Sequence, residues 1–123
     1  MISYVTLGVK DLDAAKTFYT ELLADMGAKV LADMGRICFI GKSMDSPMLA
    51  VCTPHDEQPA QVGNGTMVAF APSTKEGVDA YYNKAIALGA TCDGAPGERV
   101  PNVFYGAYVR DLDGNKICFN HFL

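Results

Sequence analysis

The sequence predicts an α+β fold in which two βαβββ units form a curved mixed sheet with a helix-covered outer face. Three observations support this prediction: an element order that occurs twice, two helical segments with matching apolar faces, and a hairpin signal near the end of the chain. The length suits a single domain, which we predict over residues 1–123 with repeats at about 1–55 and 64–123. A sheet with helices on one face leaves a concave face free, and we expect a ligand cup there.

The first repeat opens with a strand pattern over residues 2–9. Asp11 follows this strand, and its carboxylate is suited to cap the helix that comes next. That helix is indicated by apolar residues at helical spacing, which are Ala15, Phe18, Tyr19, Leu22 and Leu23. We expect Gly27 to end the helical segment. Three further strands are predicted at about Lys29–Ala32, Arg36–Ile40 and Met48–Cys52.

A polar stretch, Pro54–Gly65, separates the repeats and has the composition of a linker. The second repeat then begins with a strand pattern at Thr66–Ala71. Ser73 and Glu76 fit a capping box at the start of a second helix, because each can satisfy a free amide there. The apolar face of this helix consists of Val78, Tyr81, Tyr82, Ala85 and Ile86.

The two helical faces coincide when 63 is subtracted from the second set of residue numbers. The aromatic pair Phe18-Tyr19, for example, corresponds to the pair Tyr81-Tyr82. Both helical segments are also followed by a Gly-Ala pair, with a slip of one residue. A repeat of this size predicts two supersecondary units that share one core, because neither can bury its sheet face alone.

The chain ends in a predicted hairpin over residues 104–120. Aromatic and β-branched residues lead into a polar turn, where Asp113 tolerates the left-handed region and Gly114 adopts it at no cost. A short strand near Thr91–Asp93 and a Gly/Pro-rich loop at Asp93–Asn102 are predicted before the hairpin. The second repeat therefore again has the order strand, helix, strand, strand, strand.

Composition and charge exclude several classes of partner. Ten basic and fourteen acidic side chains give a net charge of −4, and no Lys/Arg run could follow a phosphate backbone, so we expect no nucleic-acid partner. No apolar run approaches the roughly twenty residues of a membrane span. The N-terminal residues lack the features of a secretory signal, so we expect a cytoplasmic protein with no membrane partner.

Cysteine spacing gives no sign of a metal or redox motif. The four cysteines, Cys38, Cys52, Cys92 and Cys118, form no Cys-x-x-Cys sequence. Buried, reduced thiols are the expected state of all four. A disulfide or a four-thiolate zinc site is the alternative.

Three segments carry a resemblance to a known family. They read Tyr-Val-Thr-Leu-Gly-Val-Lys-Asp-Leu-Asp-Ala-Ala-Lys-Thr-Phe-Tyr at residues 4–19, Gly-Thr-Met-Val-Ala-Phe at 65–70 and Arg-Asp-Leu-Asp-Gly-Asn-Lys at 110–116. With paired βαβββ units of this length, the chain resembles the vicinal oxygen chelate superfamily over essentially its whole length. This group contains glyoxalase I, bleomycin-resistance proteins, fosfomycin-modifying enzymes and extradiol dioxygenases. The resemblance implies the predicted fold and places function in the cup.

The resemblance also implies a divalent metal, held by His on the first strand of a unit and Glu on the last strand, which would chelate two substrate oxygens. The His positions correspond to Tyr4 and Met67. The Glu position corresponds to Cys118 in the second repeat and to Ala50 or Cys52 in the first. None of these is His or a carboxylate, so we predict no metal and no other cofactor. Tyr, Met and Cys could hold a thiophilic metal, but such a set more simply fills the cup.

Nine residues are predicted to line the ligand cup: Tyr4, Phe39, Cys52, Met67, Arg99, Tyr105, Tyr108, Cys118 and Asn120. The aromatic members suit stacking with a ligand, although alternation along a strand places only part of the set inside. Arg99 is the one strong anion-binding group near the expected mouth, where it would clamp a carboxylate or phosphate. A surface ion pair with Glu98 is the alternative for Arg99.

Covalent chemistry would need a nucleophile beside a base. Cys52 or Cys118 with His121 are the candidates, but Cys118 and His121 lie three residues apart on one strand and should point to opposite faces. His55 lies in the linker, where we expect it to be solvated. The sequence contains no nucleophile elbow, phosphate loop or dinucleotide-binding glycine pattern. It therefore identifies no catalytic residue.

These observations favour a glyoxalase/bleomycin-resistance-like protein that binds a small, partly apolar or aromatic molecule in the cup without a metal. Bleomycin-resistance proteins, which need no metal for binding, provide the nearest parallel. The alternative is a lyase or isomerase of the glyoxalase/dioxygenase type, with a divalent metal on ligands that the sequence does not reveal. The resemblance further implies a homodimer, because many relatives dimerise and an exposed sheet edge needs a cover.

Overall fold

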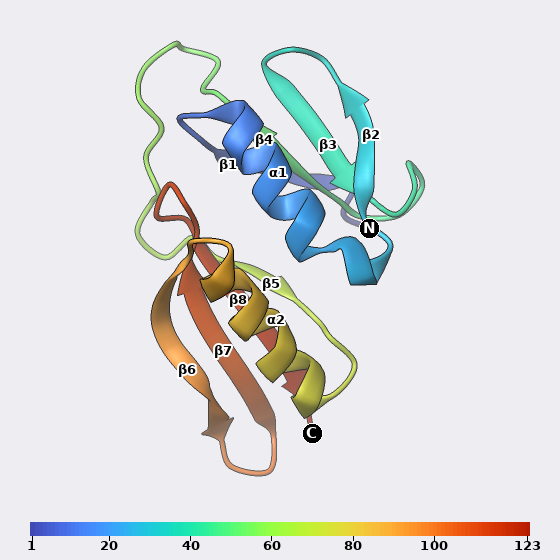
Figure 1. Cartoon of the computed structure of the whole chain (residues 1–123), viewed down its shortest axis with the longest axis vertical. Helices are drawn as coiled ribbons and strands as arrows, with labels where there is room; N and C mark the ends of the chain where they lie inside the picture. The colour runs from blue at the N-terminus through green and yellow to red at the C-terminus, as the bar shows by residue number, and fades with distance from the viewer. The chain divides into compact units, whose positions relative to one another are not determined.

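The structure is a computed structural model that describes all of residues 1–123. Its strands form two four-stranded sheets, each accompanied by one α-helix (Figure 1). The chain divides into two compact units, Met1–Gln61 and Val62–Leu123, and each unit contains one sheet with its helix. No helix in the structure is long and apolar enough to cross a membrane.

The first unit contains β1 (Tyr4–Gly8), α1 (Leu12–Leu22), a short 3-10 helix η1 (Ala24–Met26), β2 (Lys29–Asp33), β3 (Ile37–Gly41) and β4 (Met48–Cys52). The strand order in its sheet is β1-β4-β3-β2. The edge strand β1 is parallel to β4, and the other neighbouring strands are antiparallel. The predicted order of strand, helix and three strands is confirmed for this unit.

The second unit contains β5 (Val68–Phe70), α2 (Lys75–Ala87), β6 (Thr91–Val100), β7 (Phe104–Arg110) and β8 (Lys116–Phe122). Its strand order is β5-β8-β7-β6, again with one parallel pair, β5 with β8, at the edge. The two units therefore share one topology, which confirms the predicted βαβββ repeat. The strand predicted at Thr66–Ala71 is shorter than expected.

The strand registers establish which residues of the two units correspond. Thr6 pairs with Ala50 in the first unit, and Ala69, which lies 63 residues after Thr6, pairs with Cys118 in the second. Ala50 is therefore the counterpart of Cys118. Cys52 is removed as the alternative, because its partner in the ladder is Gly8.

Helix α1 forms where the sequence predicts it. Asp11 caps the helix by accepting a hydrogen bond of 3.0 Å from the Ala14 amide. All five predicted apolar residues are buried against the sheet, and removal of apolar surface from water is the main stabilising contribution of such a face. The helical segment ends at Gly27, whose φ of 80° is a left-handed conformation that glycine adopts without steric cost.

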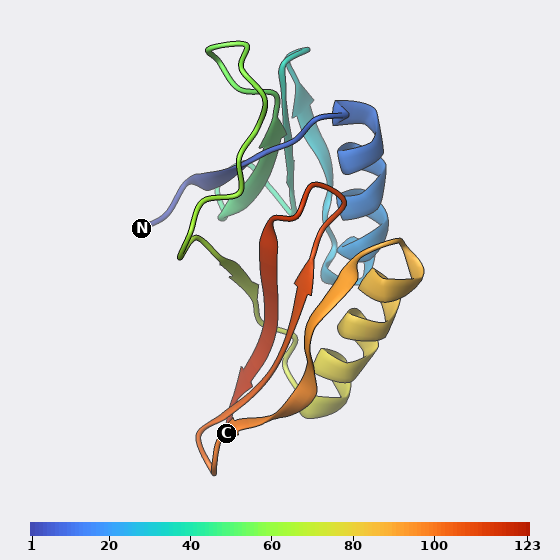
Figure 2. The same cartoon turned by 90° about the vertical axis from the view of Figure 1, so that its left-hand side faces the viewer.

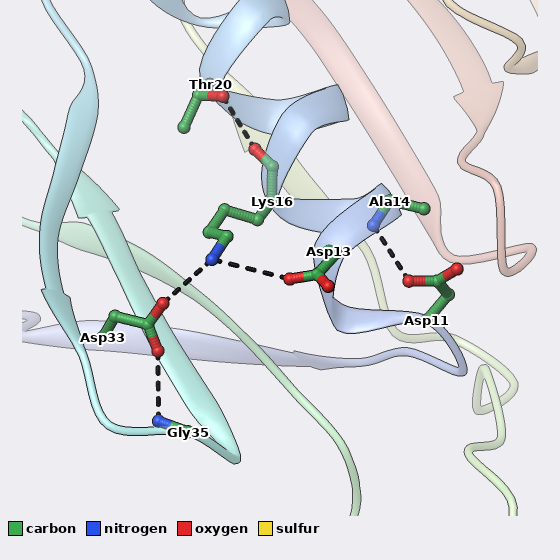
Figure 3. A network of polar contacts seen from close by, with 7 residues as sticks. All are labelled: Asp11, Asp13, Ala14, Lys16, Thr20, Asp33 and Gly35. Carbon is green, nitrogen blue, oxygen red and sulfur yellow. Dashed lines mark hydrogen bonds and ion pairs between the residues drawn. The ribbon is translucent and has the colours of Figure 1, made fainter.

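An ion pair connects α1 to the edge strand β2 (Figure 3). Nζ of Lys16 lies 2.9 Å from Oδ2 of Asp33, and Oδ1 of Asp33 accepts a hydrogen bond of 3.0 Å from the Gly35 amide. Asp13 is farther from Lys16, at 3.6 Å. The hydrogen bond between Lys16 and Asp33 lowers the pKa of Asp33 and raises the pKa of Lys16, because it favours the charged form of both.

Helix α2 is capped one residue later than the sequence suggested. Thr74 is the N-cap, and its Oγ1 accepts a hydrogen bond of 2.9 Å from the Gly77 amide. The predicted capping box of Ser73 and Glu76 is therefore wrong. Thr74 has the extended backbone, with φ of −142° and ψ of 162°, that a capping residue needs to aim its side chain at the first turn.

The face that α2 turns to its sheet is less completely buried than that of α1. Val78 and Ala85 are buried, whereas Tyr81 and Tyr82 are half-buried and Ile86 is exposed. Tyrosine hydroxyls need water or a polar partner, so two tyrosines in the middle of the face keep part of it near the surface.

The segment predicted as a loop at Asp93–Asn102 is mostly strand. β6 extends from Thr91 to Val100 and pairs with β7, although it contains two glycines and a proline. Three register shifts interrupt the pairing and absorb residues that a regular ladder would exclude. The loop prediction was wrong because a neighbouring strand, rather than local propensity, decides the conformation of this segment.

Strands β7 and β8 form the predicted hairpin, and their connection is residues 111–115, which is wider than the Asp113-Gly114 pair alone. Oδ1 of Asp111 accepts hydrogen bonds of 2.9 Å from the amides of Asp113 and Asn115. Of the predicted Asp-Gly pair, only Gly114 has a positive φ, at 89°. The wider turn follows from Asp111, whose carboxylate takes the place of the ladder in satisfying the turn amides.

Candidate functional site

Each sheet has one face without a helix (Figure 2), and side-chain alternation decides which residues that helix-free face carries. In the first unit, burial and the charge of Asp33 raise the pKa of the Cys38 thiol on β3, and the charge of Lys16 on α1 opposes this in part. Cys38 is completely buried and close to Lys16, so it belongs to the helix side. Phe39 is therefore on the helix-free face. Its ring packs edge-on against Tyr4, with centroids 4.9 Å apart and an interplanar angle of 83°. These two predicted cup residues are in contact.

Cys52 shares the helix-free face of the first sheet with Phe39. Phe39 is opposite Ala50 on β4, and Cys52 lies two residues farther along that strand. Tyr4 pairs with the other end of β4, at Met48. Tyr4 and Cys52 are therefore on one face but at opposite ends of it.

In the second unit, an aromatic stack identifies the two faces of the sheet. Phe119 of β8 stacks on Tyr81 of α2, with ring centroids 5.8 Å apart, and so lies on the helix side. Its neighbours in the strand, Cys118 and Asn120, belong to the helix-free face. Tyr108 is opposite Cys118 in the ladder and shares this face. The structure therefore brings these three predicted cup residues together.

Tyr105 lies on the other side of the same sheet. Its hydroxyl donates a hydrogen bond of 2.7 Å to Oδ1 of Asp79 on α2. This hydrogen bond raises the pKa of Tyr105, because only the protonated hydroxyl can donate it. His121 is opposite Tyr105 in the ladder and belongs to the helix side too, so Cys118 and His121 occupy opposite faces as predicted. They do not form a nucleophile–base pair.

Arg99 lies beside Tyr108 on the helix-free face of the second sheet. Its Cζ is 5.4 Å from the centroid of the Tyr108 ring. Nε donates a hydrogen bond of 3.4 Å to the carbonyl oxygen of Gly106, and Nη2 donates to the carbonyl oxygen of Ala95. Glu98 accepts a hydrogen bond from the Asn102 amide and forms no ion pair with Arg99.

A second cation lies over the same ring. Nζ of Lys116 is 5.2 Å from the centroid of Tyr108 and 3.6 Å from Oδ2 of Asp93. The same Asp93 oxygen accepts a hydrogen bond of 3.1 Å from Nε of Arg110. Sequence reasoning missed all three of these charged residues. Lys116 could have been found, because it lies two residues before Cys118 on the same strand and thus on the same face.

We refer to Arg99, Tyr108, Lys116, Cys118 and Asn120 as the Arg99 cluster. Cys118 is fully buried, and burial raises the pKa of its thiol to about 11. Burial also raises the pKa of Tyr108. Both groups are therefore neutral near pH 7, and the charge of the cluster comes from Arg99 and Lys116.

The residues at the metal-ligand positions of the resemblance do not fit a hard divalent ion. Cys118 is held as a thiol by its burial, and the ring of Tyr4 is engaged with Phe39. Met67 precedes β5 and is 43% exposed, and Ala50 has no donor atom. No group of three or more His, Cys, Asp or Glu side chains in the structure could hold a metal ion. A thioether, a thiol and a phenol are poor ligands for such ions.

The remaining cysteines and the other histidine are not members of the Arg99 cluster. All four cysteines are free; Cys38, Cys52 and Cys118 are buried, whereas Cys92 is exposed, contrary to the expectation that all four are buried. His55 is exposed in the segment that follows β4.

The fold and the helix-free sheet faces define the class to which the chain belongs. The family model for the glyoxalase/bleomycin resistance protein/dioxygenase superfamily matches residues 1–119. The chain therefore belongs to this superfamily, as the sequence predicted. No curated protein sequence gives a significant match.

Solved structures of similar proteins support the same assignment. A glyoxalase/bleomycin resistance protein from Albidiferax ferrireducens T118 is 39% identical, with 98% of each chain covered and a TM-score of 0.86. A lactoylglutathione lyase from Agrobacterium tumefaciens is 24% identical, with 98% of this chain and 92% of that chain covered and a TM-score of 0.70. The fosfomycin resistance protein FosX from Listeria monocytogenes is 21% identical, with 98% of this chain and 92% of that chain covered and a TM-score of 0.75. The last two show a shared fold only.

Proposed function

We propose that this protein binds a small, partly apolar or aromatic molecule on a helix-free sheet face through side-chain contacts, without a metal ion. The observation that carries the proposal is the chemistry at the family's last-strand ligand position. Cys118, a buried thiol with a pKa of about 11, occupies it in the second unit, and its counterpart Ala50 has no donor atom. Neither unit has a carboxylate at this position, or another group that would bind a hard divalent ion in its place.

Aromatic side chains support the same proposal. Tyr108 presents its ring on the helix-free face of the second sheet, and Tyr4 with Phe39 forms an aromatic pair on that face of the first. Aromatic rings offer large, rigid, apolar contact area and suit planar ligands. Asn120 adds an amide among these groups in the second unit, which a ligand could use for orientation.

Elemental analysis and a ligand screen test the proposal together. The protein is purified without chelator, its Mn, Ni, Zn and Fe content is measured, and its melting temperature is recorded with each ion. We expect substoichiometric metal and no shift of several degrees. A fragment screen by NMR should instead give binding of aromatic compounds to the metal-free protein. Near-stoichiometric metal, or a several-degree shift with one ion, would reject metal-free binding in favour of a metal-dependent lyase or isomerase.

We also propose that the protein is a homodimer. Apolar side chains are exposed at the end of the second unit, where Val103, Phe122 and Leu123 are 49%, 68% and 46% exposed. Burial of such side chains against a partner lowers the free energy of the system. Light scattering coupled to size exclusion should then give twice the monomer mass of 13.2 kDa, whereas a monomer at high concentration would refute this proposal.

A further inference from the structure

The Arg99 cluster carries more positive charge than its own partners neutralise. Two cations belong to the cluster, Arg99 and Lys116, and a third, Arg110, lies beside it. Asp93 is the only carboxylate that contacts any of these three side chains. Arg99 forms no ion pair at all. This face of the second unit therefore has two positive charges in excess, although the chain as a whole has a net charge of −4.

Backbone contacts hold the guanidinium of Arg99 in place while leaving donors free. One N–H of Nε and one of Nη2 are used by the carbonyl oxygens of Gly106 and Ala95. A guanidinium has five N–H donors, so three remain, including one or more on each terminal nitrogen. That end of the group retains the fork that matches both oxygens of a carboxylate. Because the side chain is already ordered, an anion would bind it at little cost in rotamer entropy.

Asn120 is a polar group of the cluster that lacks a partner in the protein. The residue is only 6% exposed, and its side chain makes no hydrogen bond in the structure, although its amide atoms are not completely sealed from solvent. Buried amides are normally hydrogen-bonded, so an amide without a partner indicates a group that something else satisfies. Asn120 lies on the same strand and face as Lys116 and Cys118.

An aromatic ring lies beside the Asn120 end of the face. Asn120 is opposite Gly106 on β7. The ring of Phe104 lies across Gly106, since a Cβ atom added to that glycine would lie 2.5 Å from Cε1 of Phe104. Tyr108 lies two residues from Gly106 along β7, which corresponds to roughly 7 Å. Arg99 and Lys116 lie over the ring of Tyr108. The face thus changes from apolar to cationic over about the length of a benzoate-sized molecule.

We propose that the ligand of this protein is a small aromatic carboxylate, whose anionic group binds Arg99 and Lys116 and whose ring lies toward Phe104. The amide of Asn120 hydrogen-bonds to a polar atom of the ligand between these two ends. This inference rests on the proposed binding function and adds the charge and shape of the molecule that is bound.

The test compares benzoate with benzamide, which has the same shape but no charge. Both are titrated into the ¹⁵N-labelled full-length protein at low ionic strength, and dissociation constants are obtained from the amide shifts. We expect benzoate to bind about tenfold tighter or more, because charge-assisted hydrogen bonds to Arg99 and Lys116 are lost with benzamide. Added salt should reduce the difference.

Substitutions locate the site. Arg99→Gln and Lys116→Gln should each weaken benzoate binding by about tenfold while leaving benzamide binding within about twofold. Asn120→Ala should weaken the binding of both ligands. Lys75→Gln is the matched control, because Nζ of Lys75 also lies over a tyrosine ring, 5.6 Å from the centroid of Tyr105, but on the helix side of the same sheet. It should change neither affinity.

The outcomes separate this inference from the proposed function. Equal affinities for benzoate and benzamide, or a benzoate affinity that Arg99→Gln does not change, would overturn the carboxylate assignment and leave aromatic binding intact. Tight binding of inorganic phosphate without binding of benzoate would overturn it as well. A screen in which no aromatic compound of any charge binds would reject the proposed function itself.

Discussion

The hydroxyl of Tyr105 donates a hydrogen bond of 2.7 Å to Oδ1 of Asp79, which joins the central strand β7 to helix α2. Both side chains are only half-buried. Lys75, one turn before Asp79 on the helix, places its Nζ 5.6 Å from the centroid of the same ring. These polar contacts stabilise the packing of α2 on its sheet, because the apolar face of this helix is only partly buried.

Replacement of Tyr105 by Phe should therefore destabilise the protein. The change removes the hydroxyl and leaves the Asp79 carboxylate without that donor, so we expect a loss of about 1–2 kcal/mol in the free energy of unfolding. Urea denaturation provides the measurement. Tyr4→Phe is the control, because the Tyr4 hydroxyl makes no hydrogen bond within the protein and Tyr4 is 46% exposed. If both variants were equally stable, the Tyr105 hydrogen bond would contribute nothing.

The cap of α2 offers a prediction in which two adjacent hydroxyl residues serve as a matched pair. Thr74→Ala removes the acceptor for the Gly77 amide and should reduce the free energy of unfolding by about 1 kcal/mol. Ser73→Ala should have almost no effect, because Ser73 does not cap the helix. Thermal or urea denaturation of both variants checks this difference, and the opposite order of effects would show that Ser73 is the cap in solution.

These helices show how far sequence reasoning extends in this fold. The apolar faces and the cap at Asp11 were predicted because they depend on residues close together in the chain. Ser73 and Thr74 could not be distinguished locally, since both have a suitable hydroxyl. The repeat supplies the missing information: Asp11 plus 63 gives Thr74, and the amide donors Ala14 and Gly77 differ by the same number.

The Arg99 cluster shows where sequence reasoning stops. Tyr108 and Cys118 lie on one face because β7 and β8 are regular strands, in which side-chain alternation can be counted. Arg99 could not be placed by counting, since the register shifts in β6 between Cys92 and Gly94, and again before Val100, change which side chains share a face. Asp93 gave no signal for the same reason.

The ion pair of Asp33 with Lys16 predicts a pH dependence of stability. Its contact with Lys16 depresses the pKa of Asp33 below 3.8 in the folded state. The contribution of Asp33 to the free energy of unfolding is therefore present above pH 3.8. It is lost as the pH falls through the lower pKa of the folded state. An NMR titration of the Asp33 carboxyl carbon should show this low pKa, and Lys16→Met should raise it. Asp13→Asn is the control and should change it little, because Asp13 lies farther from Lys16.

Cysteine reactivity should follow burial and pKa. Cys92 is exposed, so we expect it to react first with a thiol reagent at pH 8, whereas Cys118 should react only on unfolding. With a pKa of about 11, Cys118 is a thiolate in only about one molecule in a thousand at that pH. Cys92→Ser should abolish the rapid phase. A rapid phase that persists in this variant would show that a buried thiol is accessible.

The raised pKa of Cys118 also predicts a loss of stability in base. The thiol has a pKa near 9.0 in the unfolded chain and about 11 in the folded state. Its contribution to the free energy of unfolding is therefore fully present below pH 9 and is lost as the pH rises to about 11. Urea denaturation at pH 7 and pH 10.5 measures the change, and Cys118→Ala should make it smaller.

The position of Arg99 over Tyr108 depends on the glycine opposite that ring. A Cβ atom at Gly94 would lie 2.9 Å from Cδ2 of Tyr108 and 3.0 Å from Nη2 of Arg99, and the φ of Gly94 is 154°. Gly94→Ala should therefore displace both side chains, lower the free energy of unfolding by about 1–3 kcal/mol and weaken benzoate binding. Gly97→Ala in the same strand is the matched control, since the nearest atom to its Cβ would be 4.0 Å away. We expect that variant to remain within about 0.5 kcal/mol of the parent and to bind benzoate equally well. Unchanged binding in Gly94→Ala, at unchanged stability, would mean that the close packing of this strand does not hold the cation in place.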